Sequence, residues 1–224
     1  MNPNRRAAAA AGVLVLAGVL AGLLSVVSVI EQPGFLALIP AHESQVLLGA
    51  VAQFVMIPAY VGFALCLYPA LRTVNETLSL GFLGFRLIAA TFHFAGVIML
   101  PLFVLLGQEY AQAAAPHLEA LAELLRVARD LVNHVALILA LGLGDLLLFC
   151  LLYRARLVPR WLSAWGLLGA GFAMVASLLV LTGLTGVVTP LYLTMNAPLG
   201  LQSIVLALWL IVRGLRTERI VSPR

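Results

Sequence analysis

The sequence predicts an all-α membrane protein, a polytopic bundle of six transmembrane helices with both termini in the cytoplasm. Three observations support this fold class: the apolar composition, six long apolar segments, and arginines that gather at alternate segment ends. Apolar residues make up 63% of the 224-residue chain, charged residues 10%, and the mean hydropathy is +1.10. Soluble domains carry about 45–50% apolar and about 25% charged residues. The composition therefore excludes an ordinary water-soluble protein.

Six segments are long and apolar enough to cross a bilayer, which takes about 20 residues. They cover residues 7–30, 46–71, 78–106, 131–153, 161–184 and 191–212. Together they predict a single integral membrane domain over residues 1–224. The first segment follows Arg5 and Arg6, as the core of a signal peptide would. Its apolar run is about twice as long as such a core, and no clean small-x-small cleavage site ends it. We expect this segment to be retained as a transmembrane helix.

The later segments have less regular ends. The third is long enough to tilt or to run on into the outer interface. Residues 113–130 are more polar, with Pro116 near their start, and are predicted to form an interfacial lead-in to the fourth segment. Asn196, Pro198 and Gly200 interrupt the first half of the sixth segment. We prefer a kink near the outer interface there; the alternative is a broken helix that binds an ion.

The arginines predict the orientation, because cytoplasmic loops retain positive charge. All thirteen basic residues are arginines, and ten of them lie on one side of a six-span chain. These ten are Arg5, Arg6, Arg72, Arg154, Arg156, Arg160, Arg213, Arg216, Arg219 and Arg224. The opposite loops, residues 31–45, 107–115 and 185–190, contain no arginine. Both termini are therefore predicted on the cytoplasmic face of an inner membrane.

Several functions lack the residues that their chemistry needs. Without lysine, neither a Schiff base nor a lysine nucleophile can form. Cys66 and Cys150 have no histidine pattern near them and are expected to be free thiols rather than zinc ligands. His42-Glu43 lacks the second zincin histidine, because Val46 stands at that position. No serine-hydrolase elbow and no nucleotide-binding glycine motif occurs. We expect no metal, no cofactor and no nucleic-acid partner, and read the net charge of +4 as topology charge.

Two ionisable residues fall deep in predicted spans, where insertion costs about 2.5–3.5 kcal/mol. Arg86 and Asp145 each lie roughly eight residues, or about 12 Å, from the cytoplasmic ends of their helices. Neighbouring antiparallel helices would place them level, so we predict an Arg86–Asp145 ion pair. The pair either fixes the register of two helices or belongs to a working site.

Further polar residues share helix faces with this pair. The spacings from Arg86 to His93 and from His134 to Asp145 keep each pair within about 20° around a helix. Arg126, Asp130 and His134 follow at intervals of four from the outer interface. The predicted ligand or polar cluster comprises Arg86, His93, Asp130, His134, Asp145 and Gln202. The alternatives are a hydrogen-bonded core histidine at His93 and a solvated helix end at residues 126–134.

Three stretches carry a family resemblance. They are residues 67–72 (LYPALR) followed by Gly84-Phe85-Arg86, residues 152–166 (LYRARLVPRWLSAWG), and residues 207–214 (ALWLIVRG). They resemble a bacterial membrane family known only as domain of unknown function 4386. The resemblance implies a six-helix fold in a bacterial inner membrane and brings no established activity. The family often has glutamates where this chain has Ala89 and Gln202, so a function that depends on those acids would be altered here.

Two functions remain open, and the catalytic residues stay unassigned. The first is a non-enzymatic module that binds a small molecule or lipid, or that assists transport. The second is a membrane-embedded lipid-modifying enzyme with His93, His134 and Asp145 as proton-handling groups. Membrane lipid and a small hydrophobic ligand are the expected partners, with a homo-oligomer left open. Convergence of His93, Arg86 and Asp145 on one solvent-reachable cavity would favour the enzyme, and full packing would favour the module.

Overall fold

The computed structural model describes residues 3–216, which fold into helices and short connections with no strand in that range. The elements are α1 (Pro3–Leu24), η1 (Ser28–Glu31), α2 (Phe35–Leu38), η2 (Ile39–Ala41), α3 (Glu43–Leu71), α4 (Glu76–Gln112), α5 (Pro116–Asp130), η3 (Leu131–Ala136), α6 (Leu137–Ala155), α7 (Arg160–Leu181) and α8 (Pro190–Val212). Six stretches of the described chain are long and apolar enough to span a membrane. The prediction of an all-α, six-span membrane protein is confirmed.

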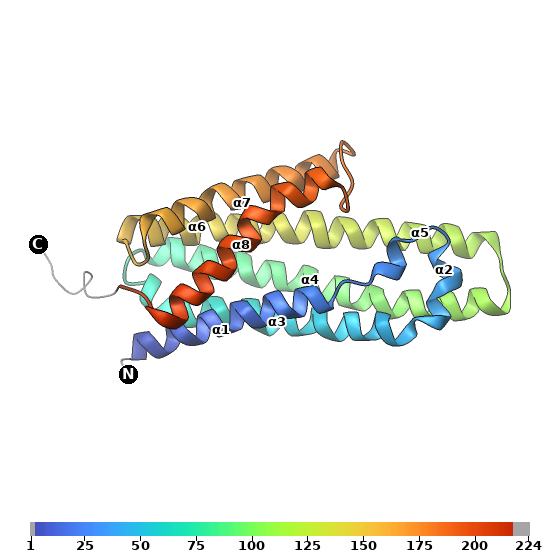
Figure 1. The fold of residues 1–224 in the computed structure, drawn as a ribbon, viewed down its shortest axis with the longest axis horizontal. Coiled ribbons are helices and arrows are strands. Elements are labelled where there is room, and N and C mark those ends of the chain that lie inside the picture. Colours follow the sequence, from blue (N-terminus) through green and yellow to red (C-terminus); the bar gives the residue numbers. More distant parts are fainter. Residues whose placement is uncertain (1–2, 217–224) are drawn as a thin grey trace, which may run out of the picture.

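The six long helices form a closed ring (Figure 1). Each packs on two neighbours, in the order α1, α3, α4, α6, α7, α8 and back to α1. The start of α1 meets the end of α8, where the Arg5 guanidinium donates hydrogen bonds to the carbonyl oxygens of Ile211 at 3.2 Å and Val212 at 2.6 Å. Both ends of the described chain therefore lie at the same end of the ring.

That end also carries most of the arginines, and we call it the arginine-rich end. It holds the start of α1, the end of α3, the α6–α7 connection and the end of α8. The described arginines there are Arg5, Arg6, Arg72, Arg154, Arg156, Arg160, Arg213 and Arg216. Arg219 and Arg224, which are predicted on the same side, lie outside the described residues. The assignment of this end to the cytoplasm stays a prediction.

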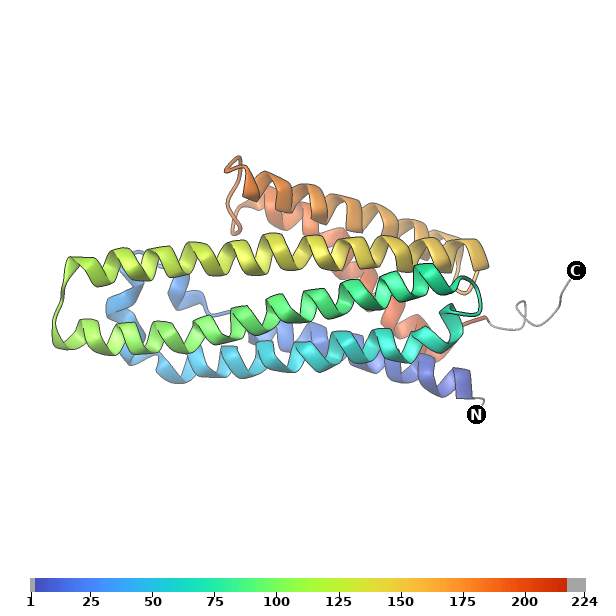
Figure 2. The same cartoon turned by 180° about the vertical axis from the view of Figure 1, so that it is seen from behind.

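The helices differ in length, and this sets the level of the bilayer. α1, α7 and α8 have 22, 22 and 23 residues, or about 33 Å at 1.5 Å per residue. That length matches a hydrocarbon core of about 30 Å. α3 and α4 have 29 and 37 residues, and α5, η3 and α6 form one rod over 40 residues. α3, α4 and this rod reach well past the short helices at the end opposite the arginines (Figure 2). We call this end the extended end.

A folded-back connection covers this extension. The first helix ends at Leu24, not at residue 30 as predicted, because residues 28–41 turn into the short helices η1, α2 and η2. α2 and η2 pack on α4, where the rings of Phe35 and Phe103 meet edge to face at 5.7 Å. The predicted lead-in at residues 113–130 is the helix α5, which continues into α6 through the π-helical turn η3.

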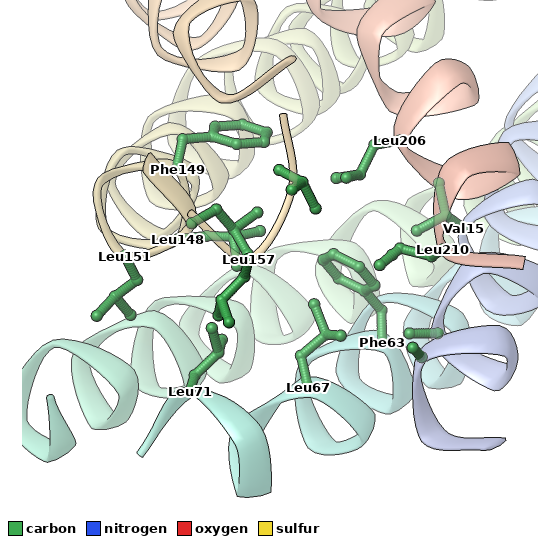
Figure 3. Close-up of a cluster of buried hydrophobic side chains, with 14 of the residues drawn as sticks. Val15, Phe63, Leu67, Leu71, Leu148, Phe149, Leu151, Leu157, Leu206 and Leu210 are labelled. Carbon is green, nitrogen blue, oxygen red and sulfur yellow. The ribbon is translucent and has the colours of Figure 1, made fainter. Parts of the chain in front are cut away.

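A tight apolar cluster closes the ring at the arginine-rich end (Figure 3). Side chains from α1, α3, α6 and α8 converge there with Leu157 from the α6–α7 connection. The labelled members are Val15, Phe63, Leu67, Leu71, Leu148, Phe149, Leu151, Leu157, Leu206 and Leu210. Val15, Phe63 and Leu206 also line a cavity farther into the ring. The apolar cluster is therefore the floor of that cavity.

Candidate ligand site within the membrane

The predicted ion pair between α4 and α6 is present. The Nη2 atom of Arg86 donates a hydrogen bond to Oδ1 of Asp145, and only 6% and 11% of the two side chains is exposed. Three aromatic rings surround the guanidinium, those of Tyr60, Phe63 and Phe82, with centroids 5.8, 5.3 and 5.5 Å from its carbon. Cation–π contacts of this kind strengthen when the cation is desolvated. The charge of Arg86 is thus held by one carboxylate and an aromatic cage.

The ion pair lines a cavity of about 250 Å³ inside the ring, which we call the central cavity. Its wall consists of Val15, Val19, Tyr60, Phe63, Arg86, Ile138, Leu141, Gly142, Asp145, Leu148, Phe149, Asn196, Leu199, Gly200, Ser203 and Leu206. Asn196 and Ser203 donate hydrogen bonds at 2.9 Å to carbonyl oxygens one turn earlier in α8. α8 runs as one helix through Pro198, so the alternative of a broken helix that binds an ion is not formed. The wall is apolar except around the ion pair and this stretch of α8.

His93 follows Arg86 by seven residues in α4 and lies farther from the arginine-rich end. Its ring stacks on Tyr60 with centroids 5.6 Å apart and planes 21° from parallel, so Tyr60 contacts both Arg86 and His93. Only 2% of His93 is exposed. Neither ring nitrogen has a hydrogen-bond partner within the described part of the chain. The interpretation of His93 as a hydrogen-bonded core histidine is therefore wrong.

His93 lines a second cavity, of about 500 Å³, which we call the outer cavity. Its wall consists of Gly22, Ser25, Val26, Val27, Ser28, Glu31, Gln53, Met56, His93, Arg129, Asn133, His134, Leu137, Ile138, Val187, Val188 and Leu193. Ile138 belongs to the walls of both cavities. The two cavities therefore adjoin at this side chain.

An amide bridge crosses the outer cavity wall. Gln53 of α3 donates from Nε2 to Oδ1 of Asn133 at 2.9 Å. Gly96 of α4 makes room for it, since a Cβ there would lie 2.3 Å from that oxygen and 2.5 Å from the Gln53 nitrogen. Asn133 sits in the π-helical turn η3, a local widening that is common at functional sites. Sequence reasoning missed Gln53 and Asn133, although a polar side chain in an apolar span was a usable signal.

The stripe predicted from Arg126 through Asp130 to His134 divides in two. Arg126 binds Glu123 at 2.6 Å, Asp130 at 3.2 Å and Glu31 at 3.7 Å. His134 instead contacts the Tyr192 hydroxyl at 3.0 Å through Nδ1. The π-helical turn accounts for this separation, because its extra residue shifts the phase of the helix beyond Asp130. Asp130 belongs to the ion network, and His134 to the outer cavity.

Gln202 lies apart from the other predicted residues. It is fully buried between α7 and α8, where its Nε2 donates to the Leu162 carbonyl oxygen at 3.1 Å. It lines neither cavity. Its role in the structure is to hold the two helices together.

The site residues do not resemble a metal centre. Among residues 3–216 no group of three or more His, Cys, Asp and Glu side chains is placed to hold a metal ion. Cys66 and Cys150 are free thiols.

Comparisons with known proteins place the chain in one family. A family model described as a domain of unknown function (DUF4386) matches residues 10–214. No curated protein and no solved structure matches the chain.

Proposed function

The chain belongs to the DUF4386 family, and from this premise we propose that it binds a small amphipathic molecule in the central cavity. The single observation that carries the proposal is the position of the Arg86–Asp145 pair on the wall of an otherwise mostly apolar space. Ligand pockets combine an apolar wall with a few polar groups that fix the orientation of the ligand. An ion pair that only fixed the register of two helices would need no cavity beside it, whereas this pair lines one.

The arrangement of α1 and α8 supports a route from the bilayer. The two helices cross closely near the arginine-rich end, where a Cβ on Gly12 would lie 2.5 Å from the Ala207 carbonyl oxygen. Toward the extended end they diverge, and the start of α8 lies with the end of α7 (Figure 1). Val15 and Val19 of α1 and Gly200 of α8 line the central cavity, and Gly200 is also exposed on the outside of the ring. We propose that a ligand dissolved in the membrane enters the cavity laterally beside Gly200, without crossing the extended end.

The enzyme alternative has weaker support. General acid–base catalysis needs its groups within hydrogen-bond reach of one reacting centre. Asp145 lines the central cavity, whereas His93 and His134 line the outer cavity. Asp145 is also engaged by Arg86, and His134 by Tyr192. These groups divide between two cavities, so binding accounts for the geometry better than proton chemistry does.

The orientation follows from the charge distribution. We propose that the arginine-rich end faces the cytoplasm of a bacterium and that the protein is a multi-pass component of its inner membrane. The extended end, with α2 and most of α5, would then lie on the outer side. The support is the concentration of arginines at the starts of α1 and α7 and at the ends of α3, α6 and α8.

Mass spectrometry of molecules that co-purify with the protein tests the proposal. We compare the wild type with Ser203→Phe, which places a ring in the central cavity and removes only a hydrogen bond within α8. Leu201→Phe is the matched control, because it adds a ring on the same helix at a side chain that is 59% exposed. The proposal expects a species that is enriched over bulk lipid, lost in Ser203→Phe and kept in Leu201→Phe. Identical profiles for all three proteins would refute it.

A further inference from the structure

The outer cavity lies at the level where the short helices end. Its wall includes Gly22 near the end of α1, Val187 and Val188 of the α7–α8 connection, and Leu193 near the start of α8. Because these helices match the hydrocarbon thickness, their ends mark the interface of the membrane. The outer cavity therefore lies where lipid head groups reside, and the central cavity lies in the hydrocarbon.

Arg129 is a buried cation in the outer cavity wall without an ion-pair partner. It is 9% exposed, and no carboxylate oxygen within the described residues comes within ion-pair distance of its guanidinium. The neighbouring acids Glu31 and Asp130 are both bound by Arg126 instead. A buried guanidinium is strongly stabilised by an anionic acceptor and is costly without one. The wall thus offers a guanidinium that no described carboxylate contacts within ion-pair distance, although Asp130 and Glu31 lie near enough to interact with its charge.

Two neutral donors accompany this charge. His93 is 2% exposed, and neither ring nitrogen has a hydrogen-bond partner among residues 3–216, so a neutral ring retains an N–H to donate. Asn133 accepts the Gln53 bond through Oδ1, which leaves its amide nitrogen as a donor. Glu31 also lines the cavity, but its carboxylate is turned to Arg126 at 3.7 Å. Beside these donors, the wall holds one buried acceptor without a partner among residues 3–216, Oε1 of Gln53, which can accept a bond from a protonated or hydroxyl-bearing head group.

We propose that the ligand is a single-chain amphiphile with an anionic head group, a carboxylate or phosphate. The head group binds Arg129 in the outer cavity, with His93 and Asn133 as further donors. The apolar chain passes Ile138, which both cavities share, and ends in the central cavity. This inference rests on the proposed function, since it assigns the chain to the cavity proposed above. Arg86 is not available as the head-group site, because Asp145 already neutralises it.

Competition against tritiated palmitate on the purified full-length protein in detergent tests the inference. On the wild type, unlabelled palmitate should displace the label at a concentration roughly tenfold or more below that of hexadecanol, because a charge-assisted hydrogen bond is lost in the alcohol. Palmitoyl lysophosphatidate should compete like palmitate. Inorganic phosphate should not compete at equal concentration, because it lacks the chain.

Variants locate the head group. Arg129→Gln should weaken palmitate binding by roughly tenfold to a hundredfold and leave hexadecanol nearly unchanged. Arg129→Lys keeps the charge and should restore most of the difference, and Arg72→Gln, at an exposed arginine of the other end, should change nothing. Equal competition by palmitate and hexadecanol on the wild type would overturn the inference, even if Arg129→Gln fails to fold. Displacement by inorganic phosphate as effective as by lysophosphatidate would also overturn it.

The result separates this inference from the proposed function. If Ser203→Phe abolishes binding of both palmitate and hexadecanol while the two compete equally on the wild type, the central cavity binds a chain and only the anionic head group is wrong. If Ser203→Phe leaves palmitate binding intact, the chain does not enter the central cavity, and both statements fail.

Discussion

The ion pair between Arg86 and Asp145 gives the sharpest energetic prediction. We consider Arg86→Met, Asp145→Leu and the double variant, which replaces the two charges by apolar side chains of similar volume. Each single change leaves one charge buried in the ring without its partner. The double change leaves none, and its side chains suit the apolar wall of the central cavity.

The magnitude follows from the burial of both groups. With side-chain exposures of 6% and 11%, the loss of one partner should cost about 3–5 kcal/mol, as for other buried pairs. For a chain of this size that loss lowers the melting temperature by about 6–20 °C. The Arg86→Met effect should lie at the upper end, because the cation–π contacts with Tyr60, Phe63 and Phe82 are lost as well. The double variant should recover most of the loss, giving a coupling free energy of about 2 kcal/mol or more.

The assay is thermal melting followed by size-exclusion chromatography in a mild detergent, on four proteins that complete the cycle. Arg72→Met is the control, since that arginine is exposed at the arginine-rich end and its loss should change stability by no more than about 0.5 kcal/mol. Strictly additive effects, with the double variant as unstable as the two single losses combined, would show that the two side chains do not stabilise one another.

Three further predictions concern packing and topology. Gly96→Ala should lower the melting temperature by about 2–12 °C, because the new Cβ would lie 2.3 Å from the Asn133 amide oxygen. Gly84→Ala on the same helix is the control: its Cβ meets nothing within 4 Å, so it should be neutral or stabilising by up to about 1 kcal/mol. Equal shifts for the two variants would contradict the close approach at Gly96. Gly12→Ala should cost about 1–3 kcal/mol in the same assay by separating α1 from α8, because the oxygen it meets at 2.5 Å belongs to the backbone; a variant as stable as the wild type would count against the helix crossing. In a protein whose native cysteines are replaced by serine, an impermeant maleimide applied to intact cells should label Ala115→Cys at once and Thr73→Cys only after permeabilisation; the reverse order would invert the proposed orientation.

The six spans and the ion pair could be predicted because each depends on a property read along one helix. Apolar length decides whether a segment can span a bilayer. Depth counted from a helix end placed Arg86 and Asp145 level, since 1.5 Å per residue holds for both helices. Neither prediction requires the order of all six helices; the ion pair requires only that the helices carrying Arg86 and Asp145 are antiparallel neighbours.

The outer part of the molecule could not be predicted in the same way. Residues 28–41 fold back on α4 because α3, α4 and the α5–α6 rod extend together past the ends of the shorter helices. The π-helical turn η3 has no sequence pattern, yet it separates His134 from Asp130. The stacking of Tyr60 on His93 and the bridge from Gln53 to Asn133 join different helices. Each of these features depends on tertiary packing between helices, and periodicity within one segment carries no information about it.

Gln202 shows the limit of judging a polar residue by its depth alone. Its place in an apolar span predicts membership of the polar cluster, but its side chain donates to the Leu162 carbonyl oxygen in the contact between α7 and α8. A substitution at this position therefore alters the α7–α8 contact rather than a cavity wall.

The central claim is that an amphiphile enters the ring between α1 and α8 and places its chain in the central cavity. Photolabelling in vesicles with palmitate that carries a diazirine at its chain end tests this claim most directly, with labelled peptides identified by mass spectrometry. We predict label at residues 15–19 and 199–206 that excess palmitate removes and that Ser203→Phe lacks. Label confined to lipid-facing side chains such as Val13 and Leu208, and unchanged by excess palmitate, would contradict the claim.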